Sequence, residues 1–347
     1  MICKKQKNSK YPSIFEFERR FNIMNVMITG VTGFAGSYLA EYLVDKPDVN
    51  IYGLKRWNSP LENIYQIMDK INLINFDLGD AHSIYRAVKE IKPNKIFHLA
   101  AQSYVPMSFK APLDTMRANV FGTINLLEAV LENGLDPVIH VCTSSEVYGQ
   151  VMEEDIPIDE KTPFRPQSPY GVSKVAEDLI AYQYFQTYGL KIVRTRSFTH
   201  TGPRSKQVFV APAFAKQIAE IELGVKKDNT IYVGNMDSIR TFLDIRDMVE
   251  AYWLLTEKGT YGEAYNIAGE HTCSVGEMLN MLLSMTEIKP QIVVDPKLLR
   301  KSDVTLQIPD ITKFKKATNW MPKIKFEDTM RDILNFWRKQ VSYEMQK

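Results

Sequence analysis

The sequence predicts an α/β protein built on a doubly wound parallel sheet, with a smaller mixed lobe toward the C-terminus. Three observations lead to this prediction. Short apolar runs alternate with longer amphipathic runs between residues 25 and 198, which is typical of β–α units in a parallel sheet. A glycine-rich turn follows the first apolar run, as in the Rossmann type of this fold. Beyond residue 198, loops with proline replace the regular alternation.

The composition is that of a globular enzyme in a reducing compartment. Hydrophobic residues make up 45% and charged residues 24% of the 347 residues. A net charge of +2 gives no reason to expect nucleic-acid binding, and no apolar run approaches the ~18–20 residues of a membrane helix. The three cysteines are scattered and odd in number. We expect a cytoplasmic protein with no metal site, because the five histidines show no ligand spacing.

The first β–α unit predicts a site for a dinucleotide. Residues 25–29 read as a buried strand and residues 37–43 as the helix that follows. Between them, glycines let the backbone turn tightly and approach a pyrophosphate, which the free amides at the helix N-terminus can bind. A simple tight turn is the alternative. The candidate cofactor residues in this turn are Gly30, Thr32, Gly33, Phe34, Ala35 and Gly36.

The end of the second strand indicates which dinucleotide is bound. Residues 50–54 form this strand, and an acidic residue that would bind the ribose hydroxyl of NAD is expected after it. Lys55 and Arg56 stand there instead, without Asp or Glu. A cationic pair suits the extra phosphate of NADP, so we predict NADP rather than NAD. The alternative is an ordinary basic pair on the surface.

The remaining units follow in order. We expect strands at 71–76, 95–99, 138–142 and 191–196, and helices at 81–91, 114–131 and from Pro169 to about Tyr188. Asp77, directly after the third strand, could reach the adenine. The predicted organisation is a tail at 1–24, a nucleotide-binding domain at 25–198 plus 242–268, and a substrate lobe at 199–241 plus 269–347.

Residues 142–174 contain the candidate catalytic groups. Ser168 and Pro169 read as a helix start, which places Tyr170 and Lys174 four residues apart on one helical face. A nearby lysine lowers the pKa of a phenol, which can then accept a proton from a sugar hydroxyl. Ser144 can hydrogen-bond the same oxygen, and Glu146 adds a carboxylate that simple alcohol oxidation does not need. The alternative is a chance pair, since this spacing is common on helices.

These motifs resemble the extended short-chain dehydrogenase/reductases, and within them the GDP-mannose 4,6-dehydratase branch. The resemblance runs from about residue 25 to 325 and is carried by Gly30-x-x-Gly33-x-x-Gly36, Gln102-Ser103-Tyr104-Val105, Ser144 to Gly149, Thr162-Pro163-Phe164, Ser168 to Gly171, Gly202-Pro203-Arg204, Gly234-Asn235-x-Asp237-x-x-Arg240, and Arg300 ahead of Asp303-Val304. It implies a homodimer or homotetramer acting on a GDP-sugar, either GDP-D-mannose or GDP-manno-heptose.

The resemblance also implies roles for single residues. Tyr170 would be the base on the sugar 4-hydroxyl, Lys174 would tune it and hold the nicotinamide ribose, and Glu146 would remove the C5 proton. Ser145 stands where the dTDP-glucose dehydratases carry Asp, which favours a GDP-sugar. Implied cofactor contacts are Arg56, Ser59, Asp77, Leu78, Ala100, Ala101 and Ser103. Implied substrate contacts are Ser103, Glu146, Thr199, Val210 and Asn235, with Arg204, Lys216, Arg240 and Arg300 as candidates to bind the diphosphate.

The sequence departs from the family pattern at two positions. Thr199 stands where Asn is usual and Thr241 where Asp is usual, which leaves details of the sugar and diphosphate pocket open. Residues 100–109 and 202–215 also resemble the GDP-4-keto-6-deoxy-mannose reductases, so a 4-reductase is the alternative function. A sugar-nucleotide epimerase, which needs no Glu146, and a non-catalytic NADP-binding protein are further alternatives.

Overall fold

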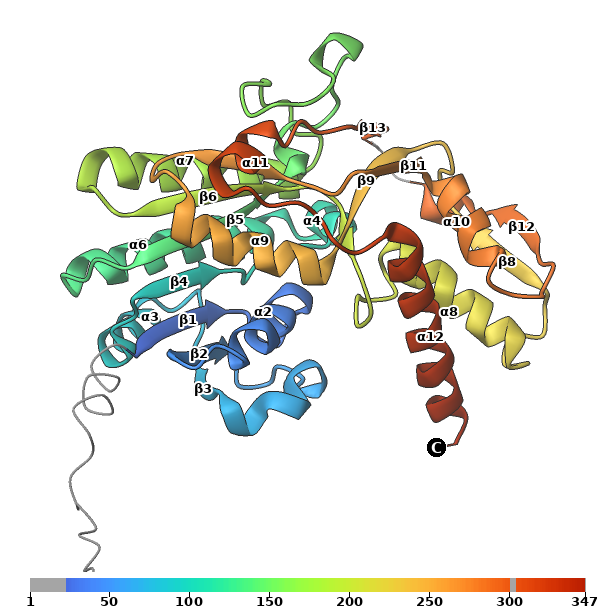
Figure 1. Cartoon of the computed structure of the whole chain (residues 1–347), viewed down its shortest axis with the longest axis horizontal. Coiled ribbons are helices and arrows are strands. Elements are labelled where there is room, and N and C mark those ends of the chain that lie inside the picture. Colours follow the sequence, from blue (N-terminus) through green and yellow to red (C-terminus); the bar gives the residue numbers. More distant parts are fainter. Residues whose placement is uncertain (1–22, 300–303, 347) are drawn as a thin grey trace, which may run out of the picture.

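The computed structural model describes residues 23–299 and 304–346, so all but the last two residues of the predicted tail lie outside the described residues. A seven-stranded sheet lies between two layers of helices, and a smaller lobe adjoins it (Figure 1). Every strand pair in this sheet is parallel. The predicted fold class is therefore confirmed.

The strand order places the carboxyl ends of the central strands β1 and β4 at the candidate site. The order is β10-β6-β5-β4-β1-β2-β3, and the direction of winding reverses between β1 and β4. Ligands of such sheets bind in the crevice outside the carboxyl ends of the strands at this point. The strands are β1 (Met24–Thr29), β2 (Val49–Lys55), β3 (Asn72–Asn75), β4 (Lys95–His98), β5 (Val138–Ser144), β6 (Ile192–Ser197) and β10 (Ala264–Ile267).

Side chains of β1 alternate between two apolar cores. Val26 and Ile28 are fully buried on the face covered by α2 (Phe34–Val44) and α9 (Ile245–Lys258). Met27 between them is buried on the other face. The helices on that face are α3 (Ala81–Ile91), α6 (Gly122–Glu132) and α7 (Pro169–Tyr188). This period of two is that of a strand with both faces covered, which fixes the carboxyl ends of the strands between two packed layers.

The predicted helix at 114–131 is three segments. α5 (Pro112–Met116) leads into a π-helical turn (η2, Arg117–Phe121) and then into α6, after the short α4 (Val105–Lys110). The wider turn contains Asn119, whose side chain is buried and hydrogen-bonds Gln102 and Ser173. The register of the helix therefore changes where a tertiary contact needs this side chain.

The smaller lobe has its own core. Helices α8 (Val210–Glu222), α10 (Val275–Leu283) and α12 (Phe326–Met345) pack around it. Its strands are β8 (Thr230–Val233) with β12 (Gln291–Val294), and β9 (Ile239–Asp244) with β7 (His200–Thr201), β11 (His271–Ser274) and β13 (Leu306–Gln307). Only the β9–β11 pair among these is antiparallel, so the lobe is mixed.

Residues 311–320 are assigned to the substrate lobe from the sequence, but they pack on the parallel sheet. α11 (Thr312–Thr318) packs against α9 and β10, and Phe314 and Trp320 are buried in the core of the parallel sheet. This stretch therefore lies with the nucleotide-binding layers, because its aromatic side chains find their apolar partners there. The remaining short helical turns are η1 (Glu62–Lys70), η3 (Ser145–Val147), η4 (Glu153–Asp155) and η5 (Pro296–Leu298).

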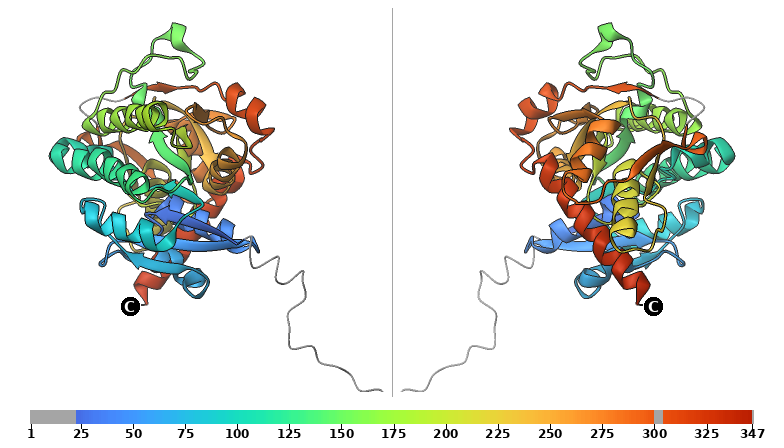
Figure 2. Two further views of the ribbon diagram at one scale, coloured as in Figure 1. Left: turned by 90° about the vertical axis from the view of Figure 1, so that its left-hand side faces the viewer. Right: turned by 90° about the vertical axis from the view of Figure 1, so that its right-hand side faces the viewer.

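The segment that contains η4 projects beyond the layers, as the green loop in both side views shows (Figure 2). Across residues 23–299 and 304–346, no helix is both long and apolar enough to cross a bilayer. The same residues contain no group of three or more His, Cys, Asp or Glu side chains arranged to hold a metal ion.

Candidate active site

The structure brings Tyr170 and Lys174 together at the start of α7. The helix begins as predicted, because the Ser168 hydroxyl accepts a hydrogen bond from the Gly171 amide at 3.0 Å and Pro169 occupies the first turn. Both side chains are buried, and the Lys174 ammonium lies 5.9 Å from the centre of the Tyr170 ring. One face of a capped helix therefore positions a phenol and a cation side by side.

The expectation that the phenol has a lowered pKa is wrong for the protein without ligands. Burial raises the pKa of Tyr170 to about 12, because loss of water disfavours the phenolate. Lys174 and the hydrogen bond with Ser144 both act in the expected downward direction, but burial has the larger effect. Lys174 therefore offsets part of the rise in the pKa of Tyr170 that burial causes.

Three candidate residues lie at the end of β5: Ser144 is its last residue, and Ser145 and Glu146 follow it. The Ser144 hydroxyl accepts a hydrogen bond from the Glu146 amide at 3.2 Å, which folds the chain into η3. The Ser145 hydroxyl donates to the side chain of Gln307 at 3.3 Å, so it faces β13 of the smaller lobe. A Cβ atom added to Gly171 would lie only 2.9 Å from the Glu146 carbonyl oxygen. The backbone of Glu146 is thus packed against the turn that presents Tyr170.

The glycine-rich turn leaves no room for side chains. Gly30 has φ +73°, and a Cβ there would meet the Ala100 backbone at 2.9 Å. A Cβ at Gly36 would lie 2.3 Å from the Gly30 carbonyl. The Thr29 hydroxyl accepts the Ala100 amide at 3.1 Å and so joins the ends of β1 and β4. The N-terminus of α2 has no side-chain cap, which leaves its amides for a bound group.

The residues predicted to contact the adenosine part of the cofactor lie at or after the ends of β2 and β3. The Lys55 ammonium donates to Asn75 at 2.9 Å, whereas the Arg56 side chain is exposed. The chain turns back at Ser59, whose amide donates to the Arg56 carbonyl at 3.0 Å. Asp77 accepts the Gly79 amide at 2.8 Å. Of the other candidates, Leu78 lies beneath α6 next to Gly122, and Ala101 and Ser103 are exposed beside Ala100.

The structure places Arg204 against the nucleotide-binding layers. Its guanidinium binds both carboxylate oxygens of Glu41 at 2.6 and 2.7 Å and lies 3.7 Å above the Tyr38 ring. It also donates to the Asn63 carbonyl at 2.8 Å. We therefore assign Arg204 to the contact between the two lobes instead of to a diphosphate.

The other predicted substrate residues lie on the smaller lobe or at its edge. The Thr199 carbonyl accepts the Leu243 amide at 3.0 Å, Val210 begins α8, and Asn235 accepts the Asp237 amide at 3.0 Å. The Lys216 ammonium donates to Gln207 at 2.5 Å. Arg240 donates to the Val304 carbonyl, and Arg300 lies outside the described residues.

Two residues at the site were not predicted. Glu177 is buried and accepts a hydrogen bond from Lys174 at 2.9 Å. Asn119 holds the Gln102 backbone, which carries Ser103. The contact between Lys174 and Glu177 could have been expected, because Glu177 stands three residues after Lys174 on the same helix. No sequence signal indicated the contact between Asn119 and Gln102, because it depends on the π-helical turn.

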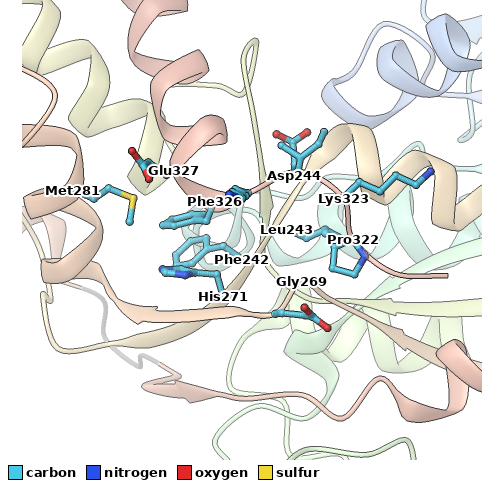
Figure 3. Close-up of a pocket in the computed structure, with 13 residues that line it drawn as sticks. Phe242, Leu243, Asp244, Gly269, His271, Met281, Pro322, Lys323, Phe326 and Glu327 are labelled. Carbon is cyan, nitrogen blue, oxygen red and sulfur yellow. The ribbon is translucent and has the colours of Figure 1, made fainter.

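A separate hollow of about 460 Å³ lies in the smaller lobe, between β9, β11 and the start of α12. Its wall includes the rings of His271 and Phe326, stacked with centroids 4.4 Å apart, beside Phe242 (Figure 3). None of the residues that line it is a candidate for catalysis or cofactor binding. The candidate site therefore stays with the residues at the carboxyl ends of the sheet strands.

Comparison with known proteins places the chain among sugar-nucleotide enzymes. A family model described as GDP-mannose 4,6 dehydratase matches residues 27–333. A GDP-6-deoxy-D-mannose reductase from Pseudomonas aeruginosa is 31% identical over 320 residues, covering 92% of this chain and 99% of the relative. A GDP-mannose 4,6-dehydratase from Yersinia enterocolitica is 32% identical over 348 residues, covering 89% and 92%.

Solved structures share the fold over nearly the same length. The structure of RMD from Pseudomonas aeruginosa complexed with NADPH matches with a TM-score of 0.78 and 30% identity, covering 91% of this chain and 98% of that one. A UDP-glucose 4-epimerase from Thermotoga maritima with UDP-glucose matches with a TM-score of 0.82 and 25% identity, covering 92% and 100%.

Proposed function

The chain belongs to the GDP-mannose 4,6-dehydratase family of extended short-chain dehydrogenase/reductase enzymes, and from this we propose that it converts a GDP-sugar into the 4-keto-6-deoxy sugar nucleotide with loss of one water. The substrate is GDP-D-mannose or GDP-manno-heptose. Oxidation at C4, loss of the C5 proton with the C6 hydroxyl, and reduction at C6 leave the cofactor unchanged overall.

The glycine-rich turn fits a dinucleotide, since Gly30 and Gly36 lack space for a Cβ and the α2 amides are uncapped. A nicotinamide cofactor bound there would accept hydride from C4 and return it to C6. We propose NADP rather than NAD, because Lys55 and Arg56 end β2 without an acid and a related structure is complexed with NADPH. Lys174 would hold the nicotinamide ribose.

The residues of the chain move the protons. Tyr170 acts as a phenolate whose negative charge Lys174 stabilises, and it accepts the proton of the 4-hydroxyl. Ser144 hydrogen-bonds the same sugar oxygen. The new 4-ketone acidifies the C5 hydrogen. Glu146 takes the C5 proton, which then leaves with the C6 hydroxyl as water. When hydride returns to C6, C5 takes back one proton, which balances the proton that Tyr170 removed from the 4-hydroxyl.

One observation carries this proposal. Glu146 stands in the turn after β5, and its backbone packs against Gly171, the neighbour of Tyr170. A carboxylate and a phenol therefore start from adjacent backbone at one sheet edge. Oxidation at C4 alone needs only the phenol, whereas elimination across C5 and C6 needs a second base.

A 4-reductase acting on a GDP-4-keto-6-deoxy sugar is the second candidate. It is supported by the Pseudomonas aeruginosa reductase, which is 31% identical along 92% of the chain. In that reaction Tyr170 would give its proton to the 4-ketone, and Glu146 would have no proton to remove.

Mass spectrometry of sugar nucleotides separates the two functions. GDP-mannose and GDP-manno-heptose are incubated separately with the protein and NADP⁺. Loss of one water from either, with no net NADPH formed, supports the dehydratase and identifies the sugar from the faster reaction. If both stay intact while a GDP-4-keto-6-deoxy sugar consumes NADPH, the reductase is the function.

The Glu146→Gln variant tests the second base. We expect loss of water to slow about 10²–10⁴-fold, since an amide cannot accept the C5 proton. The control is Glu153→Gln, which removes a carboxylate from the projecting segment and should leave the rate within about twofold. Full-rate water loss in Glu146→Gln would show that another group is the base.

A further inference from the structure

A third charged group lies beneath the Tyr170–Lys174 pair and has no part in the proposed proton transfers. Glu177 is 1% exposed, and its carboxylate accepts a hydrogen bond from the Lys174 ammonium at 2.9 Å. The ammonium also donates to the Cys142 carbonyl at 3.0 Å. Two of its three hydrogens are therefore held by protein, which leaves one for the crevice.

The other carboxylate oxygen of Glu177, Oε1, is buried without a hydrogen-bond partner. A buried, half-satisfied carboxylate is costly, so its proton is held more tightly than usual. Burial raises the pKa of Glu177 to about 7, although Lys174 and its hydrogen bond act in the opposite direction.

Two buried histidines near Lys174 stay neutral at neutral pH. His98 on β4 and His140 on β5 are buried, which lowers the pKa of each to about 3 and keeps both neutral. Asp178, the next residue on α7, is bound by Arg194 and Arg196 of β6. Tyr170 on the same helix and Cys142 on β5 also act on Lys174, and Tyr252 of α9 contacts the Cys142 thiol.

We propose that Glu177 is a positioning residue of the Tyr170–Lys174 pair, which anchors the ammonium by its hydrogen bond and sets by its charge the pH range in which Tyr170 is a base. The inference rests on the proposed roles of Tyr170 and Lys174. An ionised Glu177 opposes the effect of Lys174 and raises the pKa of the phenol. A neutral group at position 177 leaves the cation uncompensated, which favours the phenolate.

Three substitutions separate position from charge. Glu177→Gln keeps an acceptor for Lys174 but removes the charge. Glu177→Asp keeps the charge but shortens the side chain by one methylene, and Glu177→Ala removes both. Glu160→Gln is the matched control, because Glu160 is a half-buried carboxylate whose pKa is also raised by burial, and it binds the Asn266 amide instead of Lys174.

The first measurement is the pH profile of kcat between pH 5 and 9. In Glu177→Gln, the fall in kcat on the acid side should move to lower pH by roughly 0.5–1 unit, because the phenol loses its proton more readily. Glu177→Asp and Glu160→Gln should keep the wild-type position. A Glu177→Gln profile that is unmoved, or moved to higher pH, overturns the role of the charge.

The second measurement is the affinity for NADPH, which needs no turnover. We expect Glu177→Ala to bind roughly 3–10-fold more weakly, since an unanchored ammonium makes a poorer contact, and Glu177→Gln to bind within about twofold of wild type. Equal affinity in all variants overturns the anchoring role. If no GDP-sugar is turned over, the proposed function fails while this affinity series still decides the anchor. Should Glu177→Ala not fold, Glu177→Asp takes its place: its shorter side chain should weaken NADPH binding relative to Glu177→Gln, and equal affinity of the two overturns the anchoring role.

Discussion

At the scale of single residues, the hydroxyl of Tyr170 is subject to two opposing influences. Burial favours its neutral form and raises its pKa to about 12, whereas the ammonium of Lys174 favours the phenolate. A base of this kind works at neutral pH only if the cation stays close when the crevice is filled. The lysine is accordingly held by two hydrogen bonds to the protein and not left mobile.

Lys174→Met tests this dependence. Without the cation the pKa of the phenol rises further, so we expect kcat at pH 7 to fall about 10²–10⁴-fold. Lys161→Met, at an exposed lysine, is the control and should retain wild-type kcat. The measurement is the initial rate of water loss between pH 6 and 9. A Lys174→Met enzyme within threefold of wild type would mean that Tyr170 does not need the cation.

At the scale of elements, Arg204 ties the loop after β7 to α2 and η1. It holds a left-handed backbone conformation, φ +68°, while it binds Glu41 and stacks on Tyr38. The carbonyl it contacts belongs to Asn63, whose side chain donates to the Thr32 carbonyl at 3.1 Å. This contact therefore links the smaller lobe to the glycine-rich turn.

Two substitutions at this position separate contact from strain. Arg204→Ala should destabilise the protein by about 2–4 kcal/mol, from the lost charged hydrogen bonds and ring contact. Arg204→Gly loses the same contacts but relieves the left-handed backbone, so it should be about 1 kcal/mol more stable than Arg204→Ala. Urea unfolding measures both. An Arg204→Ala variant as stable as wild type would show that the contact contributes nothing to stability.

The buried histidines of β4 and β5 predict a fall in stability with acid. Their pKa values of about 3 lie below the ordinary 6.5. Between these pH values the unfolded chain therefore binds protons at both histidines that the folded chain does not bind. Their stabilising contribution is present above pH 6.5 and is lost as pH falls toward 3, by about 1.4 kcal/mol per pH unit for each.

His140→Gln isolates one of these contributions. Gln can keep the contact that His140 Nε2 makes with the Thr195 hydroxyl at 2.9 Å, but it does not titrate. The loss of unfolding free energy between pH 6 and 5 should therefore shrink by about 1.4 kcal/mol relative to wild type. Urea unfolding at the two pH values measures it. An unchanged loss would mean that His140 is protonated in the folded protein.

At the scale of the whole molecule, local sequence signals predicted the strands and helices of the layered fold. The contacts between distant segments could not be predicted in this way. The strand at β1 and the helix at α7 could be predicted because the apolar run of the one and the Ser168–Pro169 start of the other lie within each segment. The pairing of Arg204 with Glu41 joins residues 163 positions apart. The packing of α11 on α9 likewise depends on partners far along the chain.

Binding of the cofactor connects the site to the stability of the whole chain. A ligand that binds only the folded state stabilises it by about 2.7 kcal/mol at 100 times its Kd. Because Arg56 is exposed after β2 and no acid stands beside it, we expect NADP⁺ to raise Tm by more than NAD⁺ does at equal concentration. Arg56→Ala should remove most of this difference, since it deletes a cation that would face the 2′-phosphate.

Thermal unfolding with each cofactor measures this preference. Arg86→Ala, on α3, is the control for a general loss of positive charge and should keep the wild-type preference for NADP⁺. Equal shifts in Tm with NADP⁺ and NAD⁺ for the wild-type chain would contradict the assignment of NADP. A preference that survives in Arg56→Ala would instead move the selectivity to Lys55, whose ammonium would then have to leave Asn75 to reach the phosphate.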